Sequence, residues 1–323
     1  MAPGSVKFNQ NMLYGSSSGV WFPYNGGPMD GVIINKTMDR ADLKRPECRA
    51  VLAELFGLMR RMHARRAPYT SWYGTLNEWP STWDHLNRGE RYEPWPSNPD
   101  ELRIPWFLLW EIAWLIVNTP MKRGSRILDM GGAGSLFSCF LASRGHEVCA
   151  IDLQEDLCRH AEQAAATMGW RMNARQMDMT ELAFPDESFD HVFSVCVFEH
   201  LPVSGRIRCN EQVARVLKPG GTASYTFDYA DPQSFGRLDT PEDVRRQFIE
   251  PSKLSVRGGG TFSDNGKRYL HPPQCFGSGR FMGWAARLHA LLTGSVARRR
   301  ILSGSLSYTF GAIFLEKPVR EEG

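Results

Sequence analysis

The 323-residue sequence predicts an open, doubly wound α/β fold, and three observations support this prediction. From residue 125 onward, short apolar runs alternate with helical segments, which is typical of parallel strands joined by right-handed crossovers. A glycine-rich loop, "GGAGS" at 131–135, directly follows the first of these runs. Hydrophobic residues make up 42% of the chain and charged residues 23%, which is ordinary for a globular protein.

The first third of the chain precedes this alternation, and we treat residues 1–103 as an N-terminal cap. Residues 1–38 are rich in Gly, Ser, Pro and Asn and predict an extended arm or partial disorder. Helical spacing of apolar residues predicts a helix over 41–66. The stretch 67–100 is dense in Trp, Tyr and Pro and predicts either a lid over a ligand or packing against the next domain.

The predicted core covers residues 104–257 and begins with "IPWFLLWEIAWLIVNT" at 104–119. This segment is shorter than the roughly 20 residues of a membrane span and contains Glu111, so we expect a buried helix. Five strands are predicted at 126–130, 147–152, 173–178, 190–197 and 220–228, with helices at 136–144, 153–169 and 208–218.

Beyond these, Thr240 and Pro241 predict the start of a helix over 240–250, and a sixth strand is predicted at 253–258. Residues 258–303 form an insertion with one predicted helix at 281–294, which we expect to cover a substrate. The segment 304–323 carries the last strand, "SLSYTFGAIFLEKP", and a tail.

Charge and cysteine usage narrow the class of protein. A net charge of +3 is too small to argue for nucleic acid. The seven cysteines are odd in number and none forms a Cys-x-x-Cys pair, which indicates reduced thiols in the cytosol and no zinc site. The N-terminus lacks the basic and apolar runs of a signal peptide, and no membrane partner is expected.

The glycine loop does not fit a dinucleotide site. Read from Gly132, Phe137 stands where the third glycine of Gly-x-Gly-x-x-Gly is needed. Asp129, at the tip of the first strand, would repel a pyrophosphate and suits a cationic ligand. These two features argue against a nicotinamide-dependent oxidoreductase.

Residues 125–229 resemble the core of class I S-adenosylmethionine-dependent methyltransferases. The matching pieces are "RILDMGGAGS", "VCAIDL", "QMDMTELAFPDESFDHVFSVCVFEHL" and "VARVLKPGGTASYTF", in this order. The resemblance implies a Rossmann-like, mostly parallel seven-stranded sheet with an antiparallel last strand. One departure is that Ala133 and Ser135 replace the last two glycines of the family's usual loop.

Carried over residue by residue, the resemblance implies S-adenosylmethionine as cofactor. Asp129 would face the methionine ammonium, Asp152 would accept from both ribose hydroxyls, and Leu153 would pack on the adenine. Asp178 and the Met179 backbone N–H would meet the adenine amino edge. The remaining implied contacts are the glycines of the loop and the methionine-facing end of the fourth strand: Gly131, Gly132, Gly134, Val195 and Cys196.

Catalytic residues are less determined, because methyl transfer needs a base only if the acceptor must lose a proton. His200 is a candidate base; otherwise it and Glu199 shape the pocket floor or cap the next turn. Tyr229 and His271 are further candidates to face the acceptor. Tyr73 and His85, in the aromatic stretch, are others.

The resemblance therefore implies methyl transfer to a hydroxyl, amine or carbon of a small molecule, such as a biosynthetic intermediate or a sugar. Methyltransferases of nucleic-acid amines resemble one another in an Asn/Asp-Pro-Pro-Tyr/Phe element, and here that place reads "SVCVFEH". The alternative is a binding or regulatory protein that keeps the fold without transfer. Monomer and homodimer both stay open.

Overall fold

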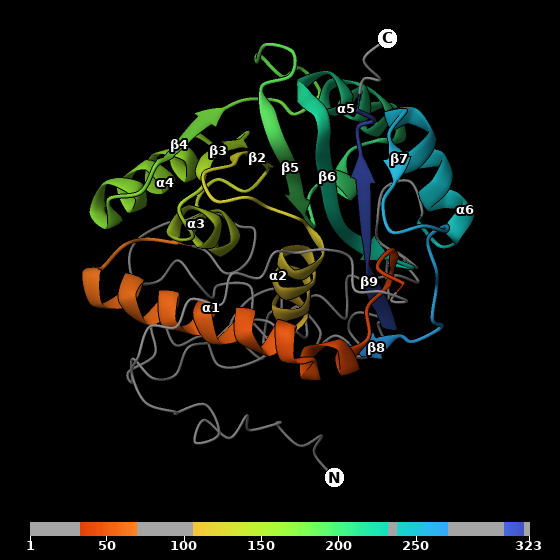
Figure 1. The fold of residues 1–323 in the computed structure, drawn as a ribbon, viewed down its shortest axis with the longest axis horizontal. Coiled ribbons are helices and arrows are strands. Elements are labelled where there is room, and N and C mark those ends of the chain that lie inside the picture. The colour runs from red at the N-terminus through yellow and green to blue at the C-terminus, as the bar shows by residue number, and fades with distance from the viewer. Residues whose placement is uncertain (1–32, 70–105, 232–237, 271–306, 320–323) are drawn as a thin grey trace, which may run out of the picture.

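The computed structural model describes residues 33–69, 106–231, 238–270 and 307–319, which form one sheet with helices on both faces (Figure 1). Most of the predicted N-terminal arm, the aromatic stretch from residue 70 and the predicted helix at 281–294 lie outside these ranges. The proposed division into cap, core and insertion stays a prediction. No described helix has both the length and the apolar character needed to cross a membrane.

The strands follow the order β1-β9-β6-β5-β2-β3-β4, with β7 and β8 also paired to β9. The parallel strands are β2 (Arg126–Met130), β3 (Glu147–Asp152), β4 (Met172–Gln176), β5 (Phe189–Val195) and β6 (Leu217–Tyr229). The last strand, β9 (Ser307–Glu316), runs antiparallel to β6. The doubly wound fold and its antiparallel last strand are confirmed, whereas the described sheet has nine strands and not the expected seven.

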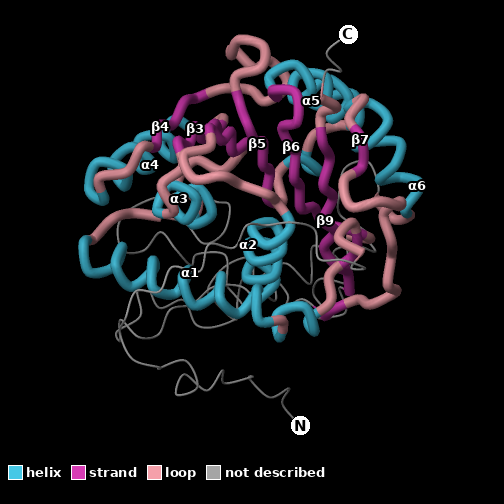
Figure 2. Tube along the Cα trace, in the orientation of Figure 1, coloured by secondary structure: helices cyan, strands magenta, loops and turns pink. Residues whose placement is uncertain are grey.

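Helices cover the two faces of this sheet because side chains alternate along each strand. Ile127 on β2 and Phe314 on β9 pack in one apolar cluster, whereas their neighbours Leu128 and Leu315 pack in the other. Figure 2 shows the helices flanking the strands. One face carries α1 (Pro46–Arg65), α2 (Trp106–Asn118), α3 (Leu136–Ser143) and α4 (Glu155–Met168), and the other carries α5 (Val203–Val216) and α6 (Pro241–Val244).

The outer edge of β9 is paired with three short strands instead of one long one. They are β8 (Tyr269–Leu270), β1 (Lys36–Thr37) and β7 (Ser255–Val256), all antiparallel to β9. The sixth strand predicted at 253–258 is therefore only two residues long, and β1, which was not predicted, continues the same edge.

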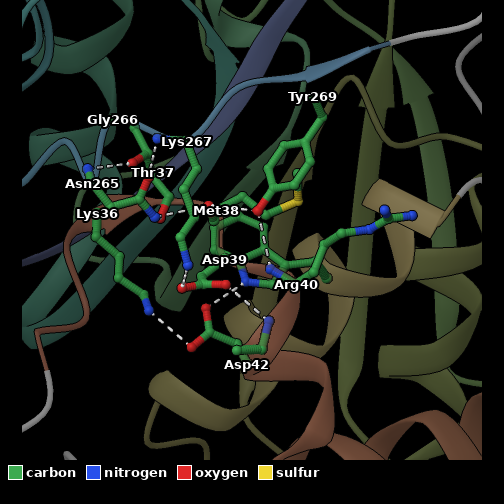
Figure 3. Close-up of polar contacts among 12 residues, drawn as sticks. Lys36, Thr37, Met38, Asp39, Arg40, Asp42, Asn265, Gly266, Lys267 and Tyr269 are labelled. Atoms are coloured by element: carbon green, nitrogen blue, oxygen red, sulfur yellow. Dashed lines mark hydrogen bonds and ion pairs between the residues drawn. The ribbon is translucent and has the colours of Figure 1, made fainter.

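Polar contacts hold the segment around β1 against residues 263–269 (Figure 3). Asp42 is 3% exposed and accepts from the Lys36 ammonium at 2.9 Å and from the indole N–H of Trp110, on α2, at 3.0 Å. Nearby, the Lys267 ammonium pairs with the carboxylate of Asp39. The buried carboxylate of Asp42, which accepts both hydrogen bonds, thus connects the N-terminal segment to the helix that lines the pocket described below.

The prediction of one continuous helix over 240–250 is only partly correct. The capping box between Thr240 and Asp243 is present, but α6 passes into a π-helical turn at Arg245–Ile249. Pro251 has no N–H to donate to the Gln247 carbonyl, so a regular helix cannot continue there. The side-chain amide of Asn210, on α5, donates to that carbonyl at 3.1 Å instead.

Candidate active site

A cavity of about 450 Å³ lies where the loops after the parallel strands meet α2 and β9. This is the expected position for a ligand in a doubly wound sheet. We call its two sides the glycine-loop half and the aromatic half. The glycine-loop half follows β2, β3 and β4: Asp129, Gly131, Gly132, Ala133, Ser135, Leu136, Asp152, Leu153, Gln154, Asp178 and Met179. The aromatic half is formed by α2, β9 and the segment after β5: Phe107, Leu108, Glu111, Cys196, His200, Tyr308 and Phe310.

At Gly131 and Gly132 the glycine loop presents its backbone to the pocket. Gly131 has φ +77° and donates its N–H to the Ile151 carbonyl at 2.7 Å. A Cβ on Gly131 would lie 2.4 Å from a methyl carbon of Val197. A Cβ on Gly132 would lie 2.0 Å from a carboxylate oxygen of Asp129. Neither position has room for a side chain.

Asp129 lies beneath this loop and is 1% exposed. Its Oδ2 accepts from the Ser138 hydroxyl at 2.6 Å, while its Oδ1 is buried with no hydrogen-bond partner in the described structure. Burial raises the pKa of Asp129 to about 7. The free oxygen offers an acceptor for an ammonium group or a water molecule.

Ser135 stands where the family's pattern has a glycine, and Phe137 stands where the dinucleotide pattern has one; both have local explanations. Ser135 is the N-cap of α3 and accepts from the Ser138 backbone N–H at 3.0 Å. Phe137, where a dinucleotide site needs a glycine, is buried and meets Phe193 edge-to-face with ring centroids 5.2 Å apart. A large aromatic ring thus separates α3 from the sheet, unlike the close packing that a pyrophosphate site requires.

The loops after β3 and β4 complete the glycine-loop half. Asp152 accepts the Gln154 backbone N–H at 3.0 Å through one oxygen, and burial raises its pKa. Leu153, beside it, is 65% exposed and presents an apolar surface. Asp178 uses Oδ1 to accept from the backbone and hydroxyl of Thr180, both at 2.8 Å, so this turn does not engage its Oδ2.

The aromatic half has flat, apolar walls. Phe107 on α2 stacks on Phe310 of β9 with ring centroids 4.5 Å apart, and Tyr308 lies 5.5 Å from Phe310. His200, in the 3-10 turn η4 (Phe198–His200), also lines this half. Such walls suit a planar or apolar group of a small molecule.

Comparison with known proteins decides the family. Residues 127–221 match the family model described as a methyltransferase domain. These residues form a class I S-adenosylmethionine-dependent methyltransferase domain. The match confirms the resemblance to methyltransferases seen in the sequence, and S-adenosylmethionine is the cofactor that this resemblance implies.

Curated relatives match less than half of the chain. The ubiquinone biosynthesis O-methyltransferase of Alkalilimnicola ehrlichii is 36% identical over 145 residues, which are 41% of this chain and 57% of that protein. The protein of the same name from Hahella chejuensis is 33% identical over 145 residues, covering 41% and 60%. The chain thus spans less than two thirds of the length of these relatives.

Solved structures show a weaker likeness. A protein from Pyrococcus horikoshii is 30% identical over 33% of this chain and 50% of that chain, with a TM-score of 0.32. The [4+2]-cyclase SpnF is 17% identical over 65% of this chain and 81% of that chain, with a TM-score of 0.47. The family assignment does not depend on either.

One acidic residue that the sequence analysis did not assign to the site lines the pocket. Glu111, on α2, lines the aromatic half and is 1% exposed. The Cys196 thiol donates to its Oε1 at 2.6 Å, and burial raises the pKa of Glu111 to about 8. The only signal in the sequence was a single acid within an otherwise uncharged helix, "WFLLWEIAWLIVN".

The structure separates the predicted site residues into three groups. Nine of the ten predicted cofactor contacts line the pocket, and Gly134 does not; among the catalytic candidates that the structure describes, only His200 lines it. Glu199 and Tyr229 are fully buried outside the lining, and the Tyr229 ring packs 5.3 Å from Phe262. His271, Tyr73 and His85 lie outside the described residues.

Proposed function

We propose that this chain transfers the methyl group of S-adenosylmethionine to a small-molecule acceptor bound in the aromatic half of the pocket. One observation carries the proposal: Asp129 and Asp152, on adjacent strands, open into one cavity beside Gly131 and Gly132, which have no room for a side chain. Asp129 suits the ammonium group of an amino acid, and Asp152 suits the hydroxyls of a ribose. The negative charge of Asp129 would repel a pyrophosphate.

In this proposal Asp129 holds the methionine ammonium through its unpartnered oxygen, directly or through water. Asp152 accepts from the ribose hydroxyls, and the exposed side chain of Leu153 packs on the adenine. Asp178 and the Met179 N–H meet the adenine amino edge. Gly131 and Gly132 let the backbone approach, and the chain at Val195 and Cys196 faces the methionine part.

The cofactor supplies a methyl group on a sulfonium, which an acceptor atom attacks in line. The protein contributes by holding that atom about 3 Å from the methyl group and by excluding water. The stacked walls of Phe107 and Phe310 orient the acceptor, and His200 borders the same space as a candidate proton acceptor. The O-methyltransferase names of the curated relatives support a small-molecule acceptor. The attacked atom is a hydroxyl oxygen, an amine nitrogen or a carbon.

The decisive experiment is the affinity of Asp152→Ala for S-adenosylmethionine, measured by calorimetry. Loss of two hydrogen bonds to an ionised acceptor should weaken binding about a hundredfold. Asp156→Ala, four residues later on the exposed first turn of α4, serves as the matched control and should stay close to the parent affinity. Equal affinities for the two variants would sink the cofactor assignment.

A further inference from the structure

Three carboxylic acids are buried together behind the aromatic half of the pocket. They are Glu111 from α2, Glu199 from η4 and Asp228 near the end of β6, and none is more than 5% exposed. We call them the buried acid cluster. Isolated buried carboxylates are costly, so a group of three needs a physical reason.

Direct contacts join the cluster. The Cys196 thiol donates to Glu111 Oε1 at 2.6 Å and lies 4.0 Å from Asp228 Oδ1. Glu199 Oε1 accepts the Asp228 backbone N–H at 2.9 Å. One polar atom from each of Cys196, Glu199 and Asp228 lies within 4.8 Å of the others. The three acids therefore share one small polar volume.

The positive groups that act on this volume, His200 and Arg206, both lie near Glu199, and within the described part of the chain none acts on Glu111 or Asp228. Arg206 lies near Glu199, but its guanidinium donates to the main-chain carbonyls of Glu199 and Leu201 and to the Gln247 side chain. Glu199 Oε2 is buried without a hydrogen-bond partner. Burial raises the pKa of all three acids, to about 8 for Glu111.

The cluster meets the pocket on the side of α2 and β5. Glu111 and Cys196 line the pocket, and the rings of Phe107, Tyr308 and Phe310 surround this entrance. Aromatic faces attract an ammonium group, particularly where water is excluded. A cation that entered through the aromatic half would meet Glu111 first, with Glu199 and Asp228 behind it.

We propose that the buried acid cluster binds a protonated amine carried by the methyl acceptor. This inference rests on the proposed function and adds the class of acceptor. A metal ion is the weaker candidate, because burial keeps the Cys196 thiol protonated and its proton is donated to Glu111, whereas metals take thiolates. An ammonium group instead donates hydrogen bonds to carboxylate oxygens, and Glu199 Oε2 is buried without a hydrogen-bond partner.

The test compares benzylamine with benzyl alcohol, which differ in charge but share a ring that suits the aromatic half. The full chain is saturated with S-adenosylhomocysteine and titrated with each compound by calorimetry. Benzylamine should bind about tenfold or more tightly than benzyl alcohol. Because its binding ionises the cluster, a proton should pass to the buffer, so the measured heat should differ between Tris and phosphate.

Matched variants assign the preference. Glu111→Gln should bring the two affinities close together, and Asp228→Asn should reduce their ratio. Glu147→Gln, an exposed acid at the start of β3, should leave the ratio unchanged. Unaltered affinity for S-adenosylhomocysteine shows that each variant is folded.

Two results would overturn the assignment: equal affinities in the parent protein, or a preference that survives both cluster variants. Titration with ZnCl₂ or MgCl₂ adds a third, since a metal that binds through Glu111 and excludes benzylamine would replace the amine. Failure of S-adenosylhomocysteine to bind would contradict the proposed function itself. Normal binding of S-adenosylhomocysteine without amine preference would contradict only this inference.

Discussion

At the scale of single residues, Gly132 has no side chain and the Asp129 carboxylate occupies the space next to its Cα. Gly132→Ala would place a methyl group 2.0 Å from that carboxylate, so the acid must move. We expect affinity for S-adenosylmethionine to fall about tenfold or more, because the loop and Asp129 shift together. Calorimetry measures this.

Gly57→Ala is the matched control for this substitution. Gly57 lies within α1, where an added Cβ would make only an ordinary contact, 3.4 Å from the Arg61 guanidinium. Alanine should stabilise the helix by about 0.5–1 kcal/mol and leave cofactor affinity unchanged. If Gly132→Ala also kept the parent affinity, the close packing of Asp129 against the loop would not matter for binding.

The buried acids also predict how stability depends on pH. The pKa of Glu111 is raised to about 8 and that of Asp129 to about 7. Between pH 6.5 and 8 the folded state therefore holds protons that the unfolded state has lost, so stability falls as pH rises. His146 and His191, with pKa values lowered to about 4, act oppositely, but only below about pH 6.5, where the unfolded chain binds their protons.

Glu111→Gln should flatten this slope by up to about 1.4 kcal/mol per pH unit. Urea unfolding of the ligand-free protein at pH 6.5, 7.25 and 8 measures it. The groups that face Glu111 are Cys196, Glu199 and Asp228, which remain in the variant. An unchanged slope would mean that Glu111 is already ionised at pH 6.5.

At the scale of elements, Asp42 joins β1 to α2. Asp42→Ala would leave the Trp110 indole N–H and the Lys36 ammonium without their acceptor in a buried place. We expect a loss of about 2–4 kcal/mol in the free energy of unfolding, measured with urea. Asp186→Ala, which removes a 73%-exposed partner of Arg215, should cost less than about 1 kcal/mol. Similar losses in the two variants would contradict the importance of burial.

The sequence predicted the regular elements well and the irregular edge poorly. The strands β2, β3 and β5 are short, mostly apolar runs, so their pattern is local and readable. The strand β1 has two residues, and its pairing with Ala312 and Gly311 depends on chain segments more than 270 positions away. The same limit applies to the helix over 240–250, where Pro251 and Asn210 decide the local geometry together.

The site divides in the same way. Asp129 and Asp152 each follow from their place at a strand end, which a sequence shows directly. Glu111 does not, because its significance comes from Cys196 and Asp228, 85 and 117 positions later. A buried acid in an apolar helix was visible, but its partners are a product of tertiary packing.

At the scale of the whole molecule, ligand binding should stabilise the fold by mass action. At one hundred times its Kd, S-adenosylhomocysteine should add about 2.7 kcal/mol and raise Tm by a few degrees. NAD at the same concentration should leave Tm unchanged, because Asp129 and Phe137 oppose a pyrophosphate site. Differential scanning fluorimetry measures both, and a larger shift with NAD would reverse the choice of cofactor.

The position of β9 also orders the assembly of the protein during synthesis. The strands that carry the glycine-loop half end by residue 176, whereas Tyr308 and Phe310 of the aromatic half lie on the last strand. The same strand gives β1 its only pairing partner among the named strands of the described structure. A nascent chain that ends at residue 300 therefore contains the strands of the glycine-loop half. The aromatic half and the pairing of β1 are completed only after β9 has been synthesised.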